Sequence, residues 1–210
     1  MDPWPLRHLV LSTPRLELRP DDDEGLLELA EQARLGVHPP DEMPFAVEWT
    51  DTAPEDLGRG VFQHHWRARA DIRPADWSVH FLVRSEGRVI GTQGLSAKDF
   101  AISGEVSTGS WIGLRHQGRG IGTEMRAAVL LFAFDHLGAV RARSSAWSGN
   151  PKSNGVSRKL GYVRDGTRTV VRRGEATEDV RFLVTPDRFV RPDWELGVTG
   201  LTACLDLLTG

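Results

Sequence analysis

The positions of apolar residues along the chain predict seven strands. Leu16 and Leu18 alternate with Glu17 and Arg19, and the apolar run 9–11 precedes them, so the first strand is expected to end at Pro20. Further alternating stretches are 79–83, 89–95, 105–113, 140–147, 162–172 and 179–183. Residues 86–87 separate the second and third strands, and 173–175 separate the last two, so each of these pairs is predicted to form a hairpin.

Apolar residues at helical spacing predict four helices between these strands. The clearest helix spans 120–137, where Ile121, Met125, Val129 and Phe132 share one face and Gly138 follows the last turn. Helices are also predicted at 23–35, 54–69 and 150–161, and a partly helical stretch at 198–208. The proline-rich segment 38–55 is expected to form an ordered, irregular loop.

The order of elements predicts an α/β (α+β) domain. Three consecutive strands favour antiparallel pairing, and the strand-helix-strand unit 107–147 favours parallel or splayed pairing, so a mixed, mostly antiparallel sheet is expected. Residues 1–190 are assigned to this domain. Residues 191–210 are expected to form a tail that packs on the domain or on a partner.

Composition mainly excludes classes of protein. Among 210 residues, 40% are hydrophobic and 26% are charged, which excludes a wholly disordered chain. The net charge of −3 and the lack of a basic stripe argue against nucleic acid as a partner. The single cysteine, Cys204, excludes an internal disulfide and a cysteine-based zinc site, and no other metal-ligand set is visible. Without a visible signal peptide or membrane-spanning segment, the chain is expected to be cytoplasmic.

The segment 113–123 carries the most informative chemistry. It joins a predicted strand to the clearest helix and contains Gly118, Gly120 and Gly122. Glycines let the backbone approach a ligand, and the first N–H groups of a helix are free to bind an anion such as phosphate. The spacing fits neither a dinucleotide-binding fingerprint nor a Walker loop. A glycine-rich helix start without a ligand remains an alternative at this point.

Five short motifs, in order, resemble the GNAT superfamily of acyl-coenzyme A N-acyltransferases. Within it, the chain is similar to the ribosomal-protein N-acetyltransferase branch, and to actinobacterial-type members linked to succinyl-CoA. The resemblance covers roughly residues 9–189. The matching motifs are Thr13-Pro14-Arg15-Leu16-Glu17-Leu18-Arg19, Gly109-Ser110-Trp111-Ile112, Gln117-Gly118-Arg119-Gly120-Ile121-Gly122, Asn150–Ser153 and Lys159–Tyr162.

The resemblance implies a GNAT fold, with the sheet splayed at its centre, helices on both faces, and acyl-CoA wedged into the splay. The residues expected to bind this donor are Trp111, Ile112, Leu114, Gln117, Gly118, Arg119, Gly120, Ile121, Gly122, Thr123, Asn150, Ser153 and Arg158. Helix capping by Asn150 and an exposed position for Arg158 are the structural alternatives.

Two residues are candidates for catalysis. The branch often carries an acid two residues before the glycine of the Gly-aromatic-Trp motif, but this chain has Ser107 there. Glu105 lies two residues earlier on the same strand face, so it is the candidate general base; the alternative is an exposed strand acid. Many GNAT enzymes use a tyrosine as acid. The only tyrosine, Tyr162, falls at a packing position, so the resemblance implies Ser153 as the proton donor to the leaving thiolate, and the alternative is no acid at all.

The acceptor is expected to be a primary amine: a protein N-terminus, a lysine or a small amine. Its cleft is assigned to His38, Phe45, Trp49 and His80, of which the aromatic residues would supply apolar walls. Acetyl is the default acyl group and succinyl is the alternative. A catalytically weak acyl-CoA binding or sensing module is the competing function. A homodimer is compatible with the resemblance, and no metal is expected.

Overall fold

The computed structural model describes residues 2–210 and contains one mixed sheet of nine strands. The order across the sheet is β7-β8-β6-β5-β4-β3-β2-β1-β9, and β5–β6 is its one parallel pair. The strands are β1 (Val10–Ser12), β2 (Glu17–Pro20), β3 (Asp76–Ser85), β4 (Arg88–Lys98), β5 (Glu105–Ile112), β6 (Arg141–Trp147), β7 (Val163–Arg172), β8 (Glu175–Val184) and β9 (Gly197–Thr199). The helices are α1 (Asp23–Arg34), α2 (Pro54–Ala70), α3 (Phe100–Ser103), α4 (Ile121–Leu131), α5 (Pro151–Lys159) and α6 (Leu205–Thr209).

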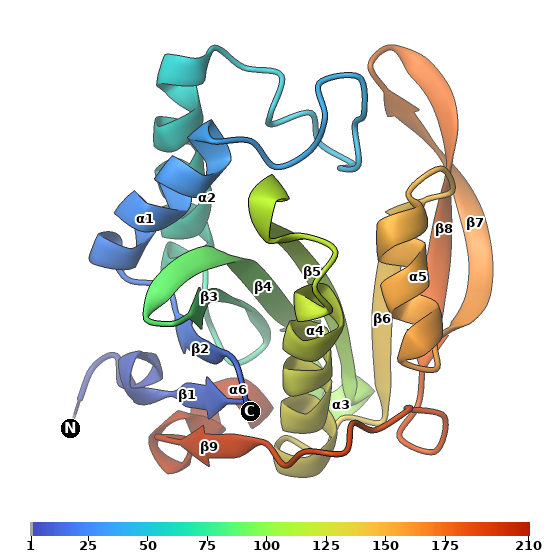
Figure 1. Cartoon of the computed structure of the whole chain (residues 1–210). Coiled ribbons are helices and arrows are strands. Elements are labelled where there is room, and N and C mark those ends of the chain that lie inside the picture. Colours follow the sequence, from blue (N-terminus) through green and yellow to red (C-terminus); the bar gives the residue numbers. More distant parts are fainter. Residues whose placement is uncertain (1) are drawn as a thin grey trace.

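Helices cover both faces of the sheet (Figure 1). Side chains alternate across a strand, so neighbouring residues of β3 serve different faces. Phe81 and Val83 join the core that contains α4, whereas Leu82 joins the core built from α1 and α2. The predicted mixed α/β fold with helices on both faces is therefore confirmed. No helix among residues 2–210 is long and apolar enough to cross a membrane.

The structure corrects the strand count at both ends of the chain. The expected first strand is two strands, because the chain reverses between Ser12 and Glu17 and β1 pairs antiparallel with β2. The tail was expected to be partly helical from Val198, but 197–199 form β9, which pairs with β1. Only the last part of the tail is helical, with a 3₁₀ turn at Thr202–Cys204 followed by α6.

The tail is packed on the domain's own sheet. The Trp77 Nε1–H donates a hydrogen bond to the Leu208 carbonyl at 3.1 Å, and Cys204 and Leu208 are buried in the main core. A buried indole N–H that finds a carbonyl satisfies both polar groups. These contacts join α6 to the start of β3, more than a hundred residues earlier in the sequence.

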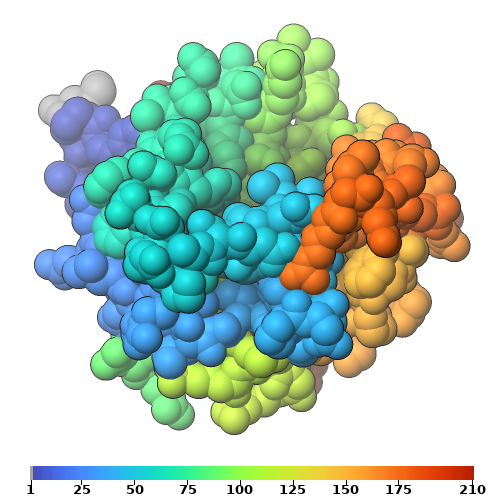
Figure 2. All heavy atoms as spheres, turned by 90° about the horizontal axis from the view of Figure 1, so that it is seen from above, coloured from blue at the N-terminus to red at the C-terminus, as the bar shows by residue number. Residues whose placement is uncertain are grey.

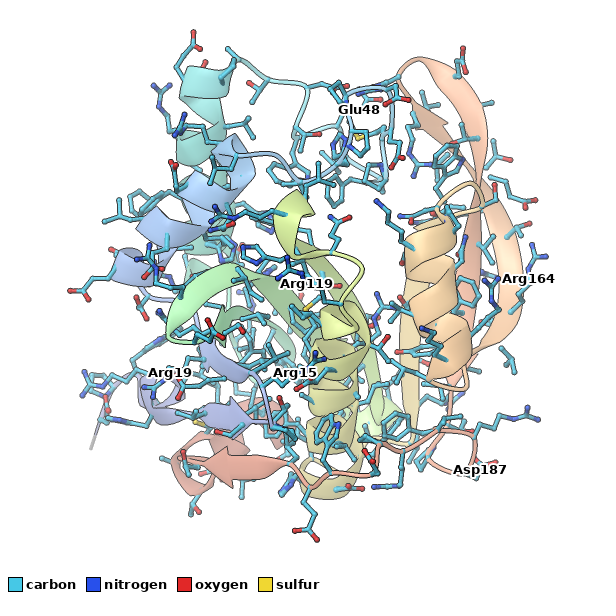
Figure 3. All side chains as sticks on the ribbon, viewed as in Figure 1. Arg15, Arg19, Glu48, Arg119, Arg164 and Asp187 are labelled. Carbon is cyan, nitrogen blue, oxygen red and sulfur yellow. The ribbon has the colours of Figure 1, made fainter. Side chains whose placement is uncertain are left out.

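Glu124 fixes the beginning of α4 to the β1–β2 turn. Its carboxylate accepts hydrogen bonds from Thr13 Oγ1 (2.6 Å), from the Arg15 backbone N–H (3.2 Å) and from Arg15 Nε (2.6 Å). Arg15 Nη1 also donates to the Arg119 carbonyl at 3.1 Å, beside the first turn of α4, and Figure 3 shows both arginines near this turn. The Thr-x-Arg motif thus positions the loop that precedes α4.

Replacing Glu124 with Ala is expected to destabilise the protein by about 2–3 kcal/mol. The substitution removes a buried charged acceptor of three hydrogen bonds and leaves the partly buried Thr13 hydroxyl and the exposed Arg15 side chain without it. Glu17→Ala is the matched control, since it breaks an exposed pair with Arg19 and should cost below about 1 kcal/mol. Chemical denaturation measures both; equal losses for the two variants would contradict the role given to Glu124.

Candidate functional site

The sheet opens at its centre, between β5 and β6. Their parallel pairing covers only Glu105–Ser107 against Arg141–Arg143. Beyond these residues β5 continues to Ile112 on the side of β4, and β6 continues to Trp147 on the side of β8. The facing edges at 108–112 and 144–147 therefore carry backbone N–H and C=O groups that no neighbouring strand uses, and such an edge can pair with an extended ligand.

A cavity of about 440 Å³ occupies this opening. Its size is within the range of small-molecule sites. Its walls come from the 38–46 loop, β5, the loop before α4, α4, β6 and α5. They include the expected donor-binding residues Trp111, Ile112, Gln117, Gly118, Gly120, Ile121, Gly122, Thr123, Asn150 and Ser153, and the expected acceptor-side residues His38 and Phe45.

The N-terminus of α4 forms one end of the cavity. Gly118 and Gly120 have φ angles of +78° and +79°, a conformation that favours glycine. Gly120 has no side chain to cap the helix, which leaves the first N–H groups of α4 available to an anion. At Gly118 and at Gly109, a Cβ atom would meet nothing within 4 Å, so the backbone is open to a ligand at both places.

Gln117 holds this loop in place. Its Nε2 donates to the carbonyls of Val37 (2.7 Å) and Ile112 (2.9 Å), and its Oε1 accepts from Lys152 Nζ at 3.0 Å. One side chain therefore connects the segment after α1, the end of β5 and the first turn of α5. Since Lys152 lines the cavity, the contact also brings a cation to this end.

The first turn of α5 places Ser153 on the cavity wall. The Asn150 side chain accepts a hydrogen bond from the Ser153 backbone N–H at 3.0 Å, so Asn150 is the N-cap of α5 and also lines the cavity. Asn150 can therefore cap the helix and face the cavity at the same time.

A contact between the β7–β8 hairpin and the 38–51 loop covers the other end of the cavity. Arg173 makes two hydrogen bonds of 2.7 Å to the Asp51 carboxylate, and its backbone N–H donates to Glu48. Arg172 Nε donates to the Phe45 carbonyl at 2.8 Å. Figure 2 shows the hairpin tip against this loop, and Figure 3 places Glu48 beside it.

An aromatic series lies under this contact. His38 packs against Phe45, Phe45 against Trp49, and Trp49 against Trp111, with ring centroids 5.2–5.7 Å apart. Trp49 lies between two cavity-lining residues without lining the cavity itself. The His38 ring is held on both sides, by the Pro39 carbonyl at 2.7 Å and by Thr50 Oγ1 at 2.8 Å.

Comparison with known proteins decides the family. The family model described as acetyltransferase (GNAT) domain matches residues 15–163, well over half of the chain. The chain belongs to the GNAT acetyltransferase family. One GNAT relative, the candidate ribosomal N-acetyltransferase YdaF of Bacillus subtilis, is 28% identical over 152 residues, which are 71% of this chain and 76% of YdaF.

Solved GNAT structures share the fold. RimJ of Mycobacterium smegmatis, in complex with CoA-disulfide, has a TM-score of 0.69 at 16% identity, with 87% of this chain and 90% of that chain covered. RimL, a ribosomal L7/L12 alpha-N-protein acetyltransferase in complex with coenzyme A, has a TM-score of 0.65 at 16% identity, with 84% and 97% covered. Identities this low carry the architecture and leave the substrates open.

Within this GNAT site, Glu105 lies outside the cavity, which differs from its expected role as general base. Its carboxylate accepts a hydrogen bond from Arg143 Nε at 2.7 Å and lies 3.9 Å from Arg141 Nε. Glu105 shares a strand face with Trp111 but starts β5, and six residues at about 3.3 Å each separate the two by roughly 20 Å. As placed, Glu105 contributes an ion pair to the joined part of β5 and β6.

His80 also lies outside the cavity. It is half-buried on β3, on the side of α2, with ring centroids 4.9 Å from His65 and 5.0 Å from His64. Burial, with the nearby His65 and His64, lowers the pKa of His80 to about 3. A neutral imidazole packed against two others is a structural group here.

Three expected donor-binding residues lie outside the cavity wall. Leu114, Arg119 and Arg158 do not line the cavity, and the Leu114 N–H donates to the Gly36 carbonyl at 2.9 Å. Lys159, the neighbour of Arg158, lines it instead. The donor-site prediction also missed residues that do line it: Thr108, Arg126, Ser144 and Lys152. Among residues 2–210, no three His, Cys, Asp or Glu side chains are arranged to hold a metal ion.

Lowering the pH is expected to destabilise the protein through His80. An unfolded histidine has a pKa of about 6.5. Between roughly pH 6.5 and 3, this histidine is therefore protonated in the unfolded chain but neutral in the folded protein. The free energy of unfolding then falls with decreasing pH, by up to about 1.4 kcal/mol per pH unit from this residue. His80→Leu should reduce that slope, measured by denaturation from pH 4.5 to 6.5; an imidazole signal of His80 that titrates near pH 6.5 would contradict it.

Arg173→Ala is expected to loosen the 38–51 loop. The variant removes both hydrogen bonds to Asp51, and hydrogen exchange of the loop amides should become faster. Because Arg173 holds the pKa of Asp51 below its usual value, the pair is present near neutrality and is lost as the pH falls through that lowered pKa. Arg164→Ala, on the same hairpin and pointing outward (Figure 3), is the control. Unchanged exchange in the loop after Arg173→Ala would show that the contact does not hold it.

Proposed function

We propose that this protein transfers an acyl group from acyl-CoA to a primary amine in a ternary complex. The observation that carries the proposal is a single cavity that joins the N-terminus of α4 to the opening between β5 and β6. The helix end suits the pyrophosphate, and the free strand edges suit the amides of an extended pantetheine arm. Lys152 and Lys159 add positive charge to the same walls.

The proposed reaction has two bond changes. The neutral amine attacks the thioester carbonyl carbon, the C–S bond breaks, the amine loses a proton and the thiolate gains one. Backbone N–H groups on the edge 108–112 are the proposed donors to the carbonyl oxygen as negative charge develops there. Ser153, on the wall formed by α5, is the proposed proton donor to the thiolate. No cysteine lines the cavity, since Cys204 is buried in the tail, which favours direct attack.

Glu42 is the proposed partner of the amine. It is the only carboxylate that lines the cavity among residues 2–210, and it belongs to the loop that covers the acceptor end. There it can hold an incoming ammonium or accept its proton directly or through water. This assignment replaces the expectation for Glu105, whose carboxylate is paired with Arg143 outside the cavity.

The site favours an α-amine as the acceptor. A lysine with a pKa of about 10.4 is rarely neutral near pH 7.4, at a cost of about 4 kcal/mol, whereas an α-amine with a pKa of about 7.7–8.0 costs below about 1 kcal/mol. Glu42 as the one carboxylate on the wall, among residues 2–210, suits the second case better. YdaF, which is named as a candidate ribosomal N-acetyltransferase, supports a ribosomal-protein acceptor, and acetyl-CoA is the proposed default donor.

Ser153→Ala is expected to slow turnover about 10-fold without abolishing it. A coenzyme thiol with a pKa near 8.5 needs little help to leave, so the loss should fall in kcat, with KM for the donor nearly unchanged. Thiol release from acetyl-CoA with peptides of different N-termini measures it. Ser107→Ala, on the exposed part of β5, is the control.

Two outcomes would contradict the proposal. Complete loss of turnover in Ser153→Ala, with donor affinity intact, would make Ser153 essential instead of an assistant. Tight acyl-CoA binding without thiol release for any amine would identify a binding or sensing module in place of an enzyme.

A further inference from the structure

The proposed function makes amines substrates, and this chain carries few side-chain amines of its own. Only three of its 26 Lys+Arg residues are lysine: Lys98, Lys152 and Lys159. The guanidinium of arginine stays protonated in proteins, so it is not an amine nucleophile. Two of the three lysines, Lys152 and Lys159, line the cavity, whereas Lys98 ends β4 and does not line it.

Lys152 extends between two elements that form walls of the cavity. It lies in the first turn of α5, next to Ser153, and its Nζ donates to Gln117 Oε1 at 3.0 Å. Gln117 belongs to the loop before α4, so the lysine side chain reaches from α5 to that loop, and both residues line the cavity. Figure 1 shows α5 beside α4 at this opening. The amine therefore lies beside the space that a bound donor would occupy.

One weak contact holds this amine. Lys152 is exposed, its partner Gln117 is a neutral amide, and among residues 2–210 no carboxylate forms a salt bridge with it. A hydrogen bond between exposed side chains contributes little, and the lysine stem is flexible. The Nζ atom can therefore leave Gln117 and move within the cavity when a donor is bound.

The two cavity lysines differ in their distance from Ser153. Because Ser153 is the proposed proton donor to the thiolate, the thioester is expected near the first turn of α5. Lys152 is adjacent to Ser153, whereas Lys159 lies six residues further along α5, roughly 9 Å along the helix axis. Lys159 is therefore an internal control within the cavity, and Lys98 is a control outside it.

We propose that Lys152 is a self-acylation site: without an acceptor, its neutral amine attacks the thioester of the acyl-CoA bound in its own cavity. This inference rests on the proposed acyltransferase function and adds a modification site to it. The bond between Nζ and the carbonyl carbon forms and the C–S bond breaks. The nitrogen loses one proton and the thiolate gains one, so the products are an acyl-lysine and free CoA.

Proximity makes a lysine usable in this position. Near pH 7.4, only about one ordinary lysine side chain in a thousand is neutral. An amine held beside its target compensates for this, since effective molarities of well-oriented groups reach about 10⁵–10⁸ M. Lys152 is loosely oriented, so the expected reaction is slow, and an acceptor amine bound at the Glu42 end should outcompete it.

Acylation of Lys152 changes the charge of the cavity. An acyl-lysine is neutral, so the walls proposed to attract the donor phosphates lose one of their two lysine charges. The expected effect is weaker binding of acyl-CoA, about 2- to 5-fold in Kd, as for the loss of an exposed charge contact. The modified protein therefore uses the donor less well, and the modification accumulates when acyl-CoA is abundant and acceptors are scarce.

Mass spectrometry of the three lysines tests the site. The full-length protein is incubated with acetyl-CoA and no acceptor, beside the same protein unfolded in guanidinium chloride, which gives the rate of purely chemical acylation. In the folded protein, Lys152 should be acylated at least about 10-fold faster than Lys159 or Lys98. At saturating acetyl-CoA, dilution of the protein should leave the fraction modified per unit time unchanged, because the reaction takes place within one molecule.

Variants separate the modification from the charge. Lys152→Arg keeps a cation that cannot be acylated, and Lys152→Gln resembles the neutral acyl-lysine. In calorimetry, the acylated parent and Lys152→Gln should both bind acetyl-CoA more weakly than Lys152→Arg. Ser153→Ala should slow self-acylation and peptide acylation by the same factor. Lys98→Arg, outside the cavity, is the control and should change neither reaction.

The contrary outcomes separate this inference from the proposed function. Equal acylation of the three lysines, at the rate of the unfolded chain, would overturn the inference, and so would a rate that rises with protein concentration. Thiol release with peptide acceptors but an unmodified Lys152 would remove the inference and leave the proposed function. Acylation of Lys152 without thiol release for any free amine would do the reverse. Acyl-CoA binding with neither reaction would remove both.

Discussion

The site depends on one feature of the sheet: the parallel pairing of β5 and β6 stops at Ser107 and Arg143. Each strand continues, but each follows a different neighbour, β4 for β5 and β8 for β6. A continuous sheet would satisfy its own backbone groups and leave no place for an extended ligand. Because these two strands separate, the centre of the domain has free strand edges and a cavity without exposing the cores on either side.

Polar contacts from distant parts of the chain hold the surroundings of this opening. On the α4 side, Glu124 ties the helix start to the β1–β2 turn through Thr13 and Arg15. At the covered end, Arg173 joins the β7–β8 hairpin to Asp51. Gln117 connects the segment after α1 with β5 and α5. In the Glu124 contact the carboxylate itself is buried, whereas both partners of the Arg173–Asp51 pair are partly exposed, so the second contact is the one better suited to opening.

The sequence predicts what local periodicity and short motifs determine. The amphipathic pattern of 120–137 and the glycines before it are local signals, and they correctly predict a helix whose first turn faces the cavity. The structure of the tail is harder to predict from the sequence. Val198 and Leu201 fit helical spacing, but 197–199 form a strand because they pair with the edge of β1, which is a tertiary contact. Strand alternation showed that Glu105 shares a face with Trp111 but said nothing about how far along that face the cavity extends. Arg126 gave no signal, since only the packing of α4 against α5 shows that its guanidinium is buried and lines the cavity.

In the proposed function, the charge along the cavity separates the place of the acyl donor from the place of the amine acceptor. The free N–H groups of α4, Lys152 and Lys159 make one end cationic, and Glu42 with the aromatic series makes the other end acidic and apolar. Under the proposed function, an anionic donor would be attracted to the first end and a cationic amine to the second, so each substrate would be repelled from the other's position. Arg126 is the one cation in the interior between them. Because this buried guanidinium has no carboxylate partner among residues 2–210, it costs stability, so the charge on this wall of the cavity is carried at the expense of the unliganded fold.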